Sequence, residues 1–279
     1  MIRRMKRLLT SLIFAALTLT LAPVAAFAQQ EDIGFAPVAE RVFAMPDFTD
    51  AHVSGLLKIL DTLVSKQTDP EKWSKDAGLH FWRLMNRLQI GKMSAAQEAM
   101  VLAKFDAFEK AHPKDKAFID VQRSMVRQLM IGKTAPEIVG KDYDGVEFKL
   151  SDYRGKVTVL YFTGQWCGPC RGEYPYERLM LEVHKNDPFA IVSVNSDSKL
   201  DVAKKAKVDE HLDFRSFWDG YLEKNTGGPI ATAWNVTGWP AIYVLDAKGT
   251  IRFAQLRQED ILKAVSQLIA EQRAAEPKK

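Results

Sequence analysis

The apolar residues of this chain follow two different spacings, which divide it into two parts. From Ala51 to Ile131 they recur every three or four positions, the spacing of amphipathic helices. Gly91 and the pair His112-Pro113 interrupt this pattern, and it ends near Gly132. The spacing therefore predicts a helical segment over residues 48–131.

Two signals mark where helices of this segment begin. Asp69-Pro70 joins an N-cap residue to a proline at the first helical position. Ser94 and Gln97 have the spacing of a capping box. The aromatic side chains here share the helical spacing, so we expect them to pack in a core and predict no chemistry from this segment.

Short apolar runs replace the helical spacing from Gly132 onward. Val157–Phe162 and Phe189–Val194 are continuous runs typical of buried strands. Asp144-Gly145 and the segment Asp246–Gly249 separate shorter runs and predict β-hairpins. Helical patterns are expected after the first buried strand as far as residue 181, and over residues 201–211, 230–234 and 261–270. This order predicts an α/β domain over residues 132–271, with a mixed central sheet flanked by helices.

The first residues have the three-part pattern of a secretory signal peptide. A basic cluster over residues 3–7 precedes the apolar run 8–21, and the triplet Ala26-Phe27-Ala28 follows. The pattern predicts cleavage after Ala28, an irregular leader over residues 29–47, and a periplasmic or secreted protein. The apolar run is shorter than the roughly 20 residues that span a membrane, and an uncleaved membrane anchor is the alternative.

The excess of positive charge belongs to this signal segment. The sequence has 39 basic and 35 acidic residues, a formal net charge of +4, and residues 1–28 have four basic residues and no acidic one. The rest of the chain is therefore balanced, which argues against a nucleic-acid-binding surface. A charged tail is expected over residues 272–279.

Both cysteines of the chain lie in one motif, Trp166-Cys167-Gly168-Pro169-Cys170, directly after a predicted buried strand. At the start of a helix, unpaired N–H groups favour the Cys167 thiolate, which is the species that attacks a disulfide. Cys170 follows one turn later on the same side and can resolve the mixed disulfide. Gly168 permits the tight turn, and Pro169 at the helix start needs no N–H donor. The motif predicts a reversible redox pair.

Other uses of the two cysteines fit less well. A structural zinc site needs about four ligands, and the sequence has neither a second cysteine pair nor paired histidines, so no metal is expected. A purely structural disulfide across so short a loop would add little stability. A peroxidatic cysteine would need a threonine at a spacing that Thr163 does not have.

Several motifs in this part of the chain resemble the exported thioredoxin-like disulfide oxidoreductases of the TlpA/ResA type, in the AhpC-TSA/redoxin superfamily. The motifs are Gly132–Pro136, Leu150–Lys156, Trp166–Arg171 and Gly238-Trp239-Pro240 followed by Ile242–Asp246. The resemblance covers residues 132–271 and not the helical segment. It implies a thioredoxin fold preceded by a small all-α domain.

The resemblance also implies roles for single residues. In the family, the proline at the position of Pro240 is cis and faces the cysteine pair. This arrangement would let a substrate chain pair with the backbone of Trp239. The alternative for Trp239 is a position in the core. Glu173 matches a carboxylate that tunes the thiols, and a solvated surface position is the alternative. Cytosolic thioredoxins have a buried aspartate where this chain has Tyr161, so Glu173 or water must accept the proton of Cys170.

These observations predict an exported thiol–disulfide oxidoreductase that reduces protein disulfides, because Gly-Pro between the cysteines resembles reducing family members and strong oxidants usually have histidine there. The expected catalytic residues are Cys167, Cys170 and Glu173, and the expected substrate-binding residues are Trp166, Gly168, Pro169, Trp239 and Pro240. No cofactor is expected.

The family implies a membrane-bound electron donor, as in cytochrome c maturation, and the helical segment is open to partner contacts. Two alternatives are a disulfide oxidase or isomerase with the same residues, and a non-enzymatic redox-sensing or partner-binding protein.

Overall fold

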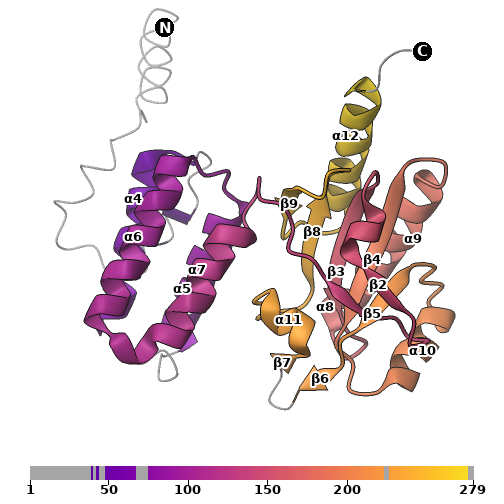
Figure 1. The fold of residues 1–279 in the computed structure, drawn as a ribbon, viewed down its shortest axis with the longest axis horizontal. Helices are drawn as coiled ribbons and strands as arrows, with labels where there is room; N and C mark the ends of the chain where they lie inside the picture. Colours follow the sequence, from indigo (N-terminus) through magenta and orange to yellow (C-terminus); the bar gives the residue numbers. More distant parts are fainter. Residues whose placement is uncertain (1–38, 40–41, 44–47, 67–74, 223–225, 276–279) are drawn as a thin grey trace, which may run out of the picture.

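A computed structural model describes residue 39 and residues 42–43, 48–66, 75–222 and 226–275 of the chain (Figure 1). The predicted signal peptide, most of the predicted leader, the Asp69-Pro70 signal and the last residues of the tail lie outside these ranges. Among the described residues, no helix combines the length and the apolar character that crossing a membrane requires.

The first part of the structure consists of helices, as the spacing predicts. They are α4 (Asp50–Lys66), α5 (Lys75–Ile90), α6 (Ala95–Ala111) and α7 (Lys116–Gln128), with the 3₁₀ turn η2 (Pro113–Asp115) before α7. The capping box is confirmed: Ser94 accepts from the backbone of Gln97, and the Gln97 side chain accepts from the backbone of Ser94. The α6 helix ends at the predicted break, because Pro113 has no N–H to continue the hydrogen-bond ladder.

The second part is built on a mixed sheet in the order β5-β4-β3-β8-β9. Its strands are β3 (Val157–Thr163), β4 (Phe189–Asn195), β5 (Arg215–Trp218), β8 (Ala241–Leu245) and β9 (Ile251–Ala254). The β3, β4 and β5 strands run parallel, whereas β8 and β9 are antiparallel to their neighbours. Both predicted hairpins are confirmed, one as β8–β9 and the other as the pair β1 (Val139–Lys141) and β2 (Glu147–Lys149) outside this sheet.

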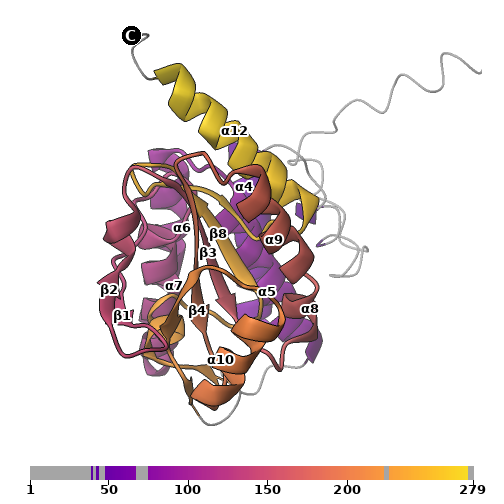
Figure 2. The same ribbon diagram turned by 90° about the vertical axis from the view of Figure 1, so that its right-hand side faces the viewer.

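Helices cover one face of the sheet and the helical segment extends the core of the other (Figures 1 and 2). The helices α9 (Tyr174–Val183) and α12 (Glu259–Ala275) pack on the face formed by side chains such as Val159 and Val244. The opposite face, with Phe162 and Tyr243, belongs to one continuous apolar cluster with the interior of the helical segment. Smaller elements complete the fold: η3 (Leu150–Tyr153), α10 (Leu200–Asp209), β6 (Tyr221–Leu222), β7 (Thr226–Gly227) and α11 (Pro229–Ala233).

A buried polar side chain ties the helical segment to the sheet. Gln89 of α5 is 3% exposed; its Nε2 donates to the Tyr243 hydroxyl at 2.8 Å, and its Oε1 accepts from Gln255 at 3.1 Å. Because both groups of the Gln89 amide have partners across the contact, this polar side chain is buried between the two parts without leaving a group unpaired. The thioredoxin-like mixed sheet flanked by helices and preceded by a helical part is therefore confirmed, with the two parts sharing a core.

Two predictions about elements were wrong or incomplete. The helix expected to run from the cysteines to residue 181 is broken into α8 (Gly168–Arg171) and α9. Pro175 cannot donate to the carbonyl of Arg171, so a continuous helix would lose a hydrogen bond there. The edge strand β5 was not predicted, because Arg215 and Ser216 interrupt its apolar pattern.

Candidate functional site

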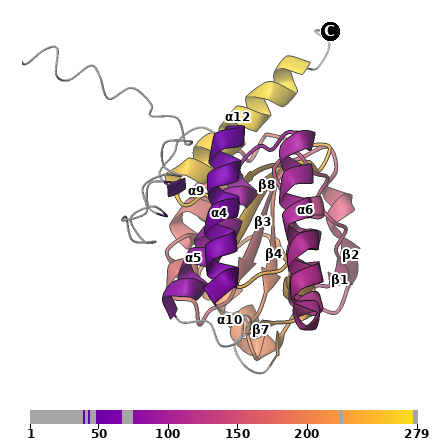
Figure 3. The ribbon, with the colours of Figure 1, turned by 90° about the vertical axis from the view of Figure 1, so that its left-hand side faces the viewer.

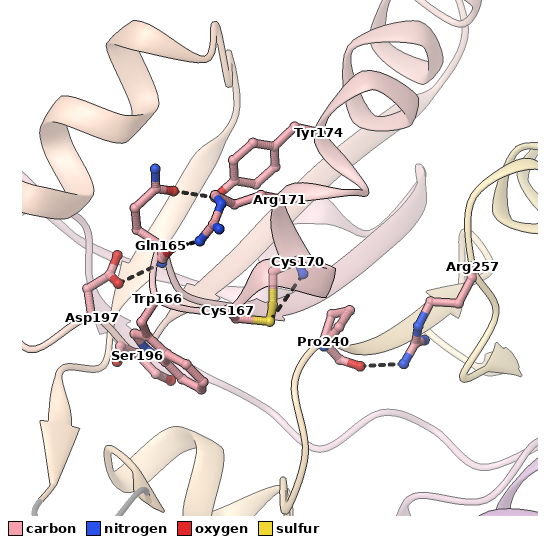
Figure 4. Close-up of a disulfide and its surroundings, with 10 residues drawn as sticks. All are labelled: Gln165, Trp166, Cys167, Cys170, Arg171, Tyr174, Ser196, Asp197, Pro240 and Arg257. Carbon is pink, nitrogen blue, oxygen red and sulfur yellow. Dashed lines mark hydrogen bonds between the residues drawn. A yellow bond between two sulfur atoms is a disulfide. The ribbon is translucent and has the colours of Figure 1, made fainter.

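The two cysteines form a disulfide where β3 gives way to α8 (Figure 4). The S–S bond is 2.07 Å and the Cα atoms are 5.2 Å apart. Both side chains are nearly buried, and Cys167, at 4% exposure, is the more accessible. Its Sγ accepts a hydrogen bond from the backbone N–H of Cys170 at 3.1 Å. The same N–H would stabilise a Cys167 thiolate after reduction, since a hydrogen bond to a charged acceptor is stronger than one to a neutral acceptor.

The loop before Cys167 is held by a buried aspartate that sequence reasoning missed. Asp197 is 2% exposed. Its Oδ1 accepts from the backbone of Gln165 at 2.6 Å (Figure 4), and its Oδ2 accepts from the Asn195 side chain at 2.9 Å. The parallel strands β3 and β4 end side by side, so residues that follow them meet at one edge. The polar run Asn195-Ser196-Asp197 directly after a predicted buried strand was the available signal.

Arg171 braces this same loop. Its guanidinium donates to the backbone carbonyl of Gln165, while the Tyr174 hydroxyl donates to the Gln165 side chain at 2.9 Å (Figure 4). The hydrogen bond to Gln165 gives Arg171 a structural partner on the loop that carries Cys167.

Two tryptophans and the cis-proline lie beside the disulfide. The Trp239–Pro240 peptide bond is cis, as the resemblance implies, and Pro240 lies next to the cysteine pair (Figure 4). Trp166 is 50% exposed; its indole donates to the Ser196 carbonyl at 3.1 Å and packs edge-on against Trp239 at 5.4 Å between ring centroids. Trp239 is half-buried and packs against the apolar core, which is the core position considered as the alternative for it.

The two residues between the cysteines occupy different surroundings. A Cβ placed on Gly168 would meet open space, and Pro169 occupies one of the first two positions of α8. Pro169 also lines a cleft together with Pro240. The disulfide is therefore flanked by two prolines, neither of which has an N–H to satisfy.

Glu173 is buried rather than solvated. It is 2% exposed, and its carboxylate accepts from the backbone N–H of Gln258 at 2.8 Å. Burial raises the pKa of Glu173, while that hydrogen bond and the charge of Arg257 oppose the rise. Arg257 in turn donates to the Pro240 carbonyl at 2.7 Å (Figure 4). Arg257, which sequence reasoning missed, thus links the buried carboxyl group to the cis-proline loop.

A second buried carboxyl group, Glu177, lies one turn further along α9. It is 1% exposed, and its Oε2 has no hydrogen-bond partner among the described residues. Burial raises its pKa to about 8, with a further contribution from Glu173, while Arg178 opposes the rise. Glu177 and Thr163 line a cavity of about 20 Å³, which is enough for one water molecule. A pKa of about 8 favours the protonated form of Glu177 at neutral pH.

Replacing Glu177 with glutamine should stabilise the oxidised protein at alkaline pH. Because the pKa of about 8 in the folded protein lies above the ordinary value of a glutamate, about 4.5, the wild-type free energy of unfolding should fall as the pH rises from about 4.5 to about 8. Glu177→Gln should remove that fall. At pH 8 its free energy of unfolding should exceed that of the wild type by on the order of 3 kcal/mol. Urea unfolding of both proteins across the window measures the difference.

The matched control is Glu182→Gln on the same helix, where the side chain is 71% exposed. It makes the same change of charge without burial, so its stability should follow the wild type at every pH. If Glu177→Gln also follows the wild type, Glu177 does not have the raised pKa.

Comparisons with known proteins cover the second part of the chain. The model of the AhpC/TSA family matches residues 131–254. The thiol-disulfide oxidoreductase ResA of Geobacillus kaustophilus is 33% identical over 125 residues, which are 44% of this chain and 68% of that protein. ResA of Bacillus subtilis is 28% identical over 121 residues, 43% of this chain and 64% of that protein.

Solved structures give matches of the same extent. The thioredoxin domain of a thiol-disulfide oxidoreductase from Bacteroides vulgatus is 26% identical, with a TM-score of 0.46, over 51% of this chain and 99% of that domain. A secreted thiol-disulfide isomerase from Corynebacterium glutamicum is 25% identical, with a TM-score of 0.43, over 48% of this chain and 84% of the other.

The helical segment lies outside the region that the family model matches. Within the matched region lie Cys167, Cys170 and Glu173, together with Trp239 and Pro240. The region that the family model matches contains the cysteine pair and the sheet that positions it, and the pair forms a disulfide in the structure. The chain belongs to the ResA-type thiol-disulfide oxidoreductases.

Proposed function

We propose that this enzyme is exported and reduces disulfides in client proteins, with Cys167 as the attacking thiol. The observation that carries the proposal is the Cys167–Cys170 disulfide with Pro240 beside it and the buried Glu173 three residues after Cys170. The greater accessibility of Cys167 supports its assignment as the first thiol to meet a client. The Gly168-Pro169 pair supports a reducing direction, because strong oxidants usually have histidine there.

The reaction moves two electrons from the protein to the client. The Cys167 thiolate attacks one sulfur of the client disulfide, whose S–S bond breaks, and the other client sulfur leaves as a thiolate that takes up a proton. Cys170 then loses its proton to Glu173 and attacks the sulfur of Cys167. This breaks the mixed disulfide, releases the second client thiolate and leaves the protein with the Cys167–Cys170 disulfide. Trp239 and Pro240 hold the client chain during the exchange, and Trp166 flanks the pair.

Each cycle leaves the enzyme oxidised, so a reductant must restore the dithiol. We propose a membrane-bound electron donor on the outer side of the cytoplasmic membrane, in a pathway such as cytochrome c maturation, and removal of residues 1–28 on export. We also propose that residues 48–131 form a helical unit and residues 132–271 the catalytic unit. The charge balance of the chain outside the signal supports a protein client rather than a nucleic acid.

The direction of electron flow is tested by the reduction potential of the cysteine pair. The protein comprising residues 29–279 is equilibrated with glutathione redox buffers. The fraction with an oxidised cysteine pair is measured by thiol trapping and mass spectrometry. A reductant should give a potential nearer to that of thioredoxin, about −270 mV, than to the value of about −120 mV found for a strong oxidant. A potential near the latter value would make the protein an oxidase.

A further inference from the structure

A cleft opens beside the disulfide, between the helical segment and the catalytic part. Its volume is about 500 Å³, within the range of small-molecule and peptide-side-chain sites. The α5 and α7 helices line it from the helical segment, and they are the helices that face α11 and β9 (Figure 1). The α4 and α6 helices lie on the outer side of the molecule (Figure 3). One side of the cleft is thus formed by α5 and α7 of the helical segment.

The cleft reaches the residues that flank the cysteine pair. Pro169, from between the cysteines, and the cis-proline Pro240 both line it. On the opposite wall the Trp82 indole of α5 lies beside the loop of the cis-proline, since a Cβ added to Gly238 would be 4.0 Å from its Nε1. A polypeptide docked against Pro240 would therefore extend onto the helical wall. The aromatic side chains of the helical segment were expected to be core, but Trp82 is 49% exposed and faces this cleft.

The lining is apolar and nearly uncharged. Among the described residues that line the cleft, Arg257 alone has a charged side chain, and its guanidinium already donates to the Pro240 carbonyl. The apolar side chains come from both parts of the chain and include Phe81, Trp82, Met85, Phe118, Met125 and Trp239. A charged segment would lose its hydration here without gaining a partner, whereas an apolar side chain would be removed from water.

Three polar groups in the lining lack partners among the described residues. The Gln122 side chain of α7 is more than nine-tenths buried, with 5% exposure, and makes no hydrogen bond. The Asn86 Nδ2 and the Trp239 Nε1 are buried donors without an acceptor. Buried polar groups in native proteins nearly always have partners. Two of these groups are N–H donors and the amide of Gln122 offers a third, so they match the backbone carbonyls of an extended peptide.

We propose that this cleft binds the segment of a client polypeptide that flanks its disulfide-bonded cysteine, and that the segment is uncharged and has a bulky apolar side chain. This inference rests on the proposed function, because the cysteine pair must act on a protein disulfide. The Trp82 wall contacts the apolar side chain, and the amide donors bind the client backbone. The helical segment thereby selects which protein disulfides reach Cys167.

The test compares two synthetic peptides of equal length in their reaction with the reduced full chain. Each has one cysteine, held as a mixed disulfide with 2-mercaptoethanol. Leucine and phenylalanine flank the cysteine in one peptide, and serine and glutamate flank it in the other. Stopped-flow fluorescence gives the second-order rate constants. Burying one large apolar side chain is worth roughly a tenfold preference or more, so the wild type should react about tenfold faster with the apolar peptide.

Trp82→Ala should reduce this preference to about twofold or less, and Trp82→Phe should restore most of it. The ratio of two rates measured on one variant cancels any change in thiol reactivity. Leu79→Ala is the matched control on the same helix, because Leu79 is 52% exposed and does not line the cleft. It should keep the wild-type ratio. Thermal unfolding of each variant establishes that it is folded.

Gln122→Leu provides a second, independent measurement. It removes an amide that would bind the backbone of either peptide, so both peptide rates should fall by about twofold to tenfold while their ratio stays near the wild-type value. Val121→Ala, at the neighbouring and 41% exposed position of α7, is its control. A wild-type ratio near one, or a ratio unchanged in Trp82→Ala, would overturn the cleft proposal. Failure of the wild type to react even with 2-hydroxyethyl disulfide would instead overturn the proposed function.

Discussion

Replacing Cys167 with serine should lower the rate of insulin reduction by at least about a thousandfold, because a serine hydroxyl is not ionised at neutral pH and is a far weaker nucleophile than a thiolate. The assay follows the turbidity of the released insulin B chain, with dithiothreitol as the terminal reductant. The remaining rate should equal that of dithiothreitol alone. Turnover at the wild-type rate would show that Cys167 is not the attacking residue.

Cys170→Ala provides the complementary result. The variant retains the attacking thiol but has no second thiol to resolve the mixed disulfide, so it should accumulate as a covalent adduct with the client. Mass spectrometry under non-reducing conditions should find one client chain on Cys167, and dithiothreitol should release it. Together the two variants assign the order in which the thiols act. An adduct on Cys167→Ser and none on Cys170→Ala would reverse the assignment. The same trap identifies clients from an extract.

Glu173→Gln should slow the resolving step by roughly a hundredfold at neutral pH, the scale of a lost general base. Burial raises the pKa of Glu173, so the wild-type rate should increase with pH as this carboxyl group ionises and becomes able to accept a proton. In Glu173→Gln that increase should disappear, and only the increase due to ionisation of the thiols themselves should remain. The rate of mixed-disulfide resolution, measured from pH 4 to pH 9 by rapid acid quench, gives both profiles.

The control for this experiment is Glu182→Gln, which makes the same change of charge on a 71% exposed side chain. It should reproduce the wild-type profile. A uniformly slower Glu173→Gln with the wild-type pH dependence would indicate that Glu173 positions the loop through Gln258 and does not accept the proton. Positioning of this loop is the role that competes with proton acceptance, because the backbone of Gln258 donates a hydrogen bond to Glu173.

The sequence was most informative where a residue's chemistry depends on its neighbours in the chain. The spacing of Cys167 and Cys170 and the breaks at proline and glycine are local features, and the disulfide, the capping box at Ser94 and both hairpins follow from them. The resemblance to a known family extended this reach to the cis bond before Pro240, because a motif carries information about contacts that spacing alone does not.

Long-range contacts of polar residues were missed for one physical reason. Asp197, Arg257 and Glu177 are ordinary surface types in a sequence, and only the surroundings that the folded chain gives them decide their roles. Asp197 holds the loop of Cys167 because β3 and β4 end side by side. Arg257 reaches the Pro240 carbonyl from a loop after β9, and Glu177 has a raised pKa because the fold removes it from water.

The amino-acid sequence by itself determined that this protein has a redox pair at a strand-to-helix junction, because the reactivity of Cys167 and Cys170 depends on a spacing of a few residues. Only the tertiary structure decided what surrounds that pair. Helical spacing places Trp82 and Gln122 on helices but cannot say which element those helices face, since packing joins residues far apart in the chain. Their meeting with Trp239 and Pro240 in one cleft is a property of the shared core.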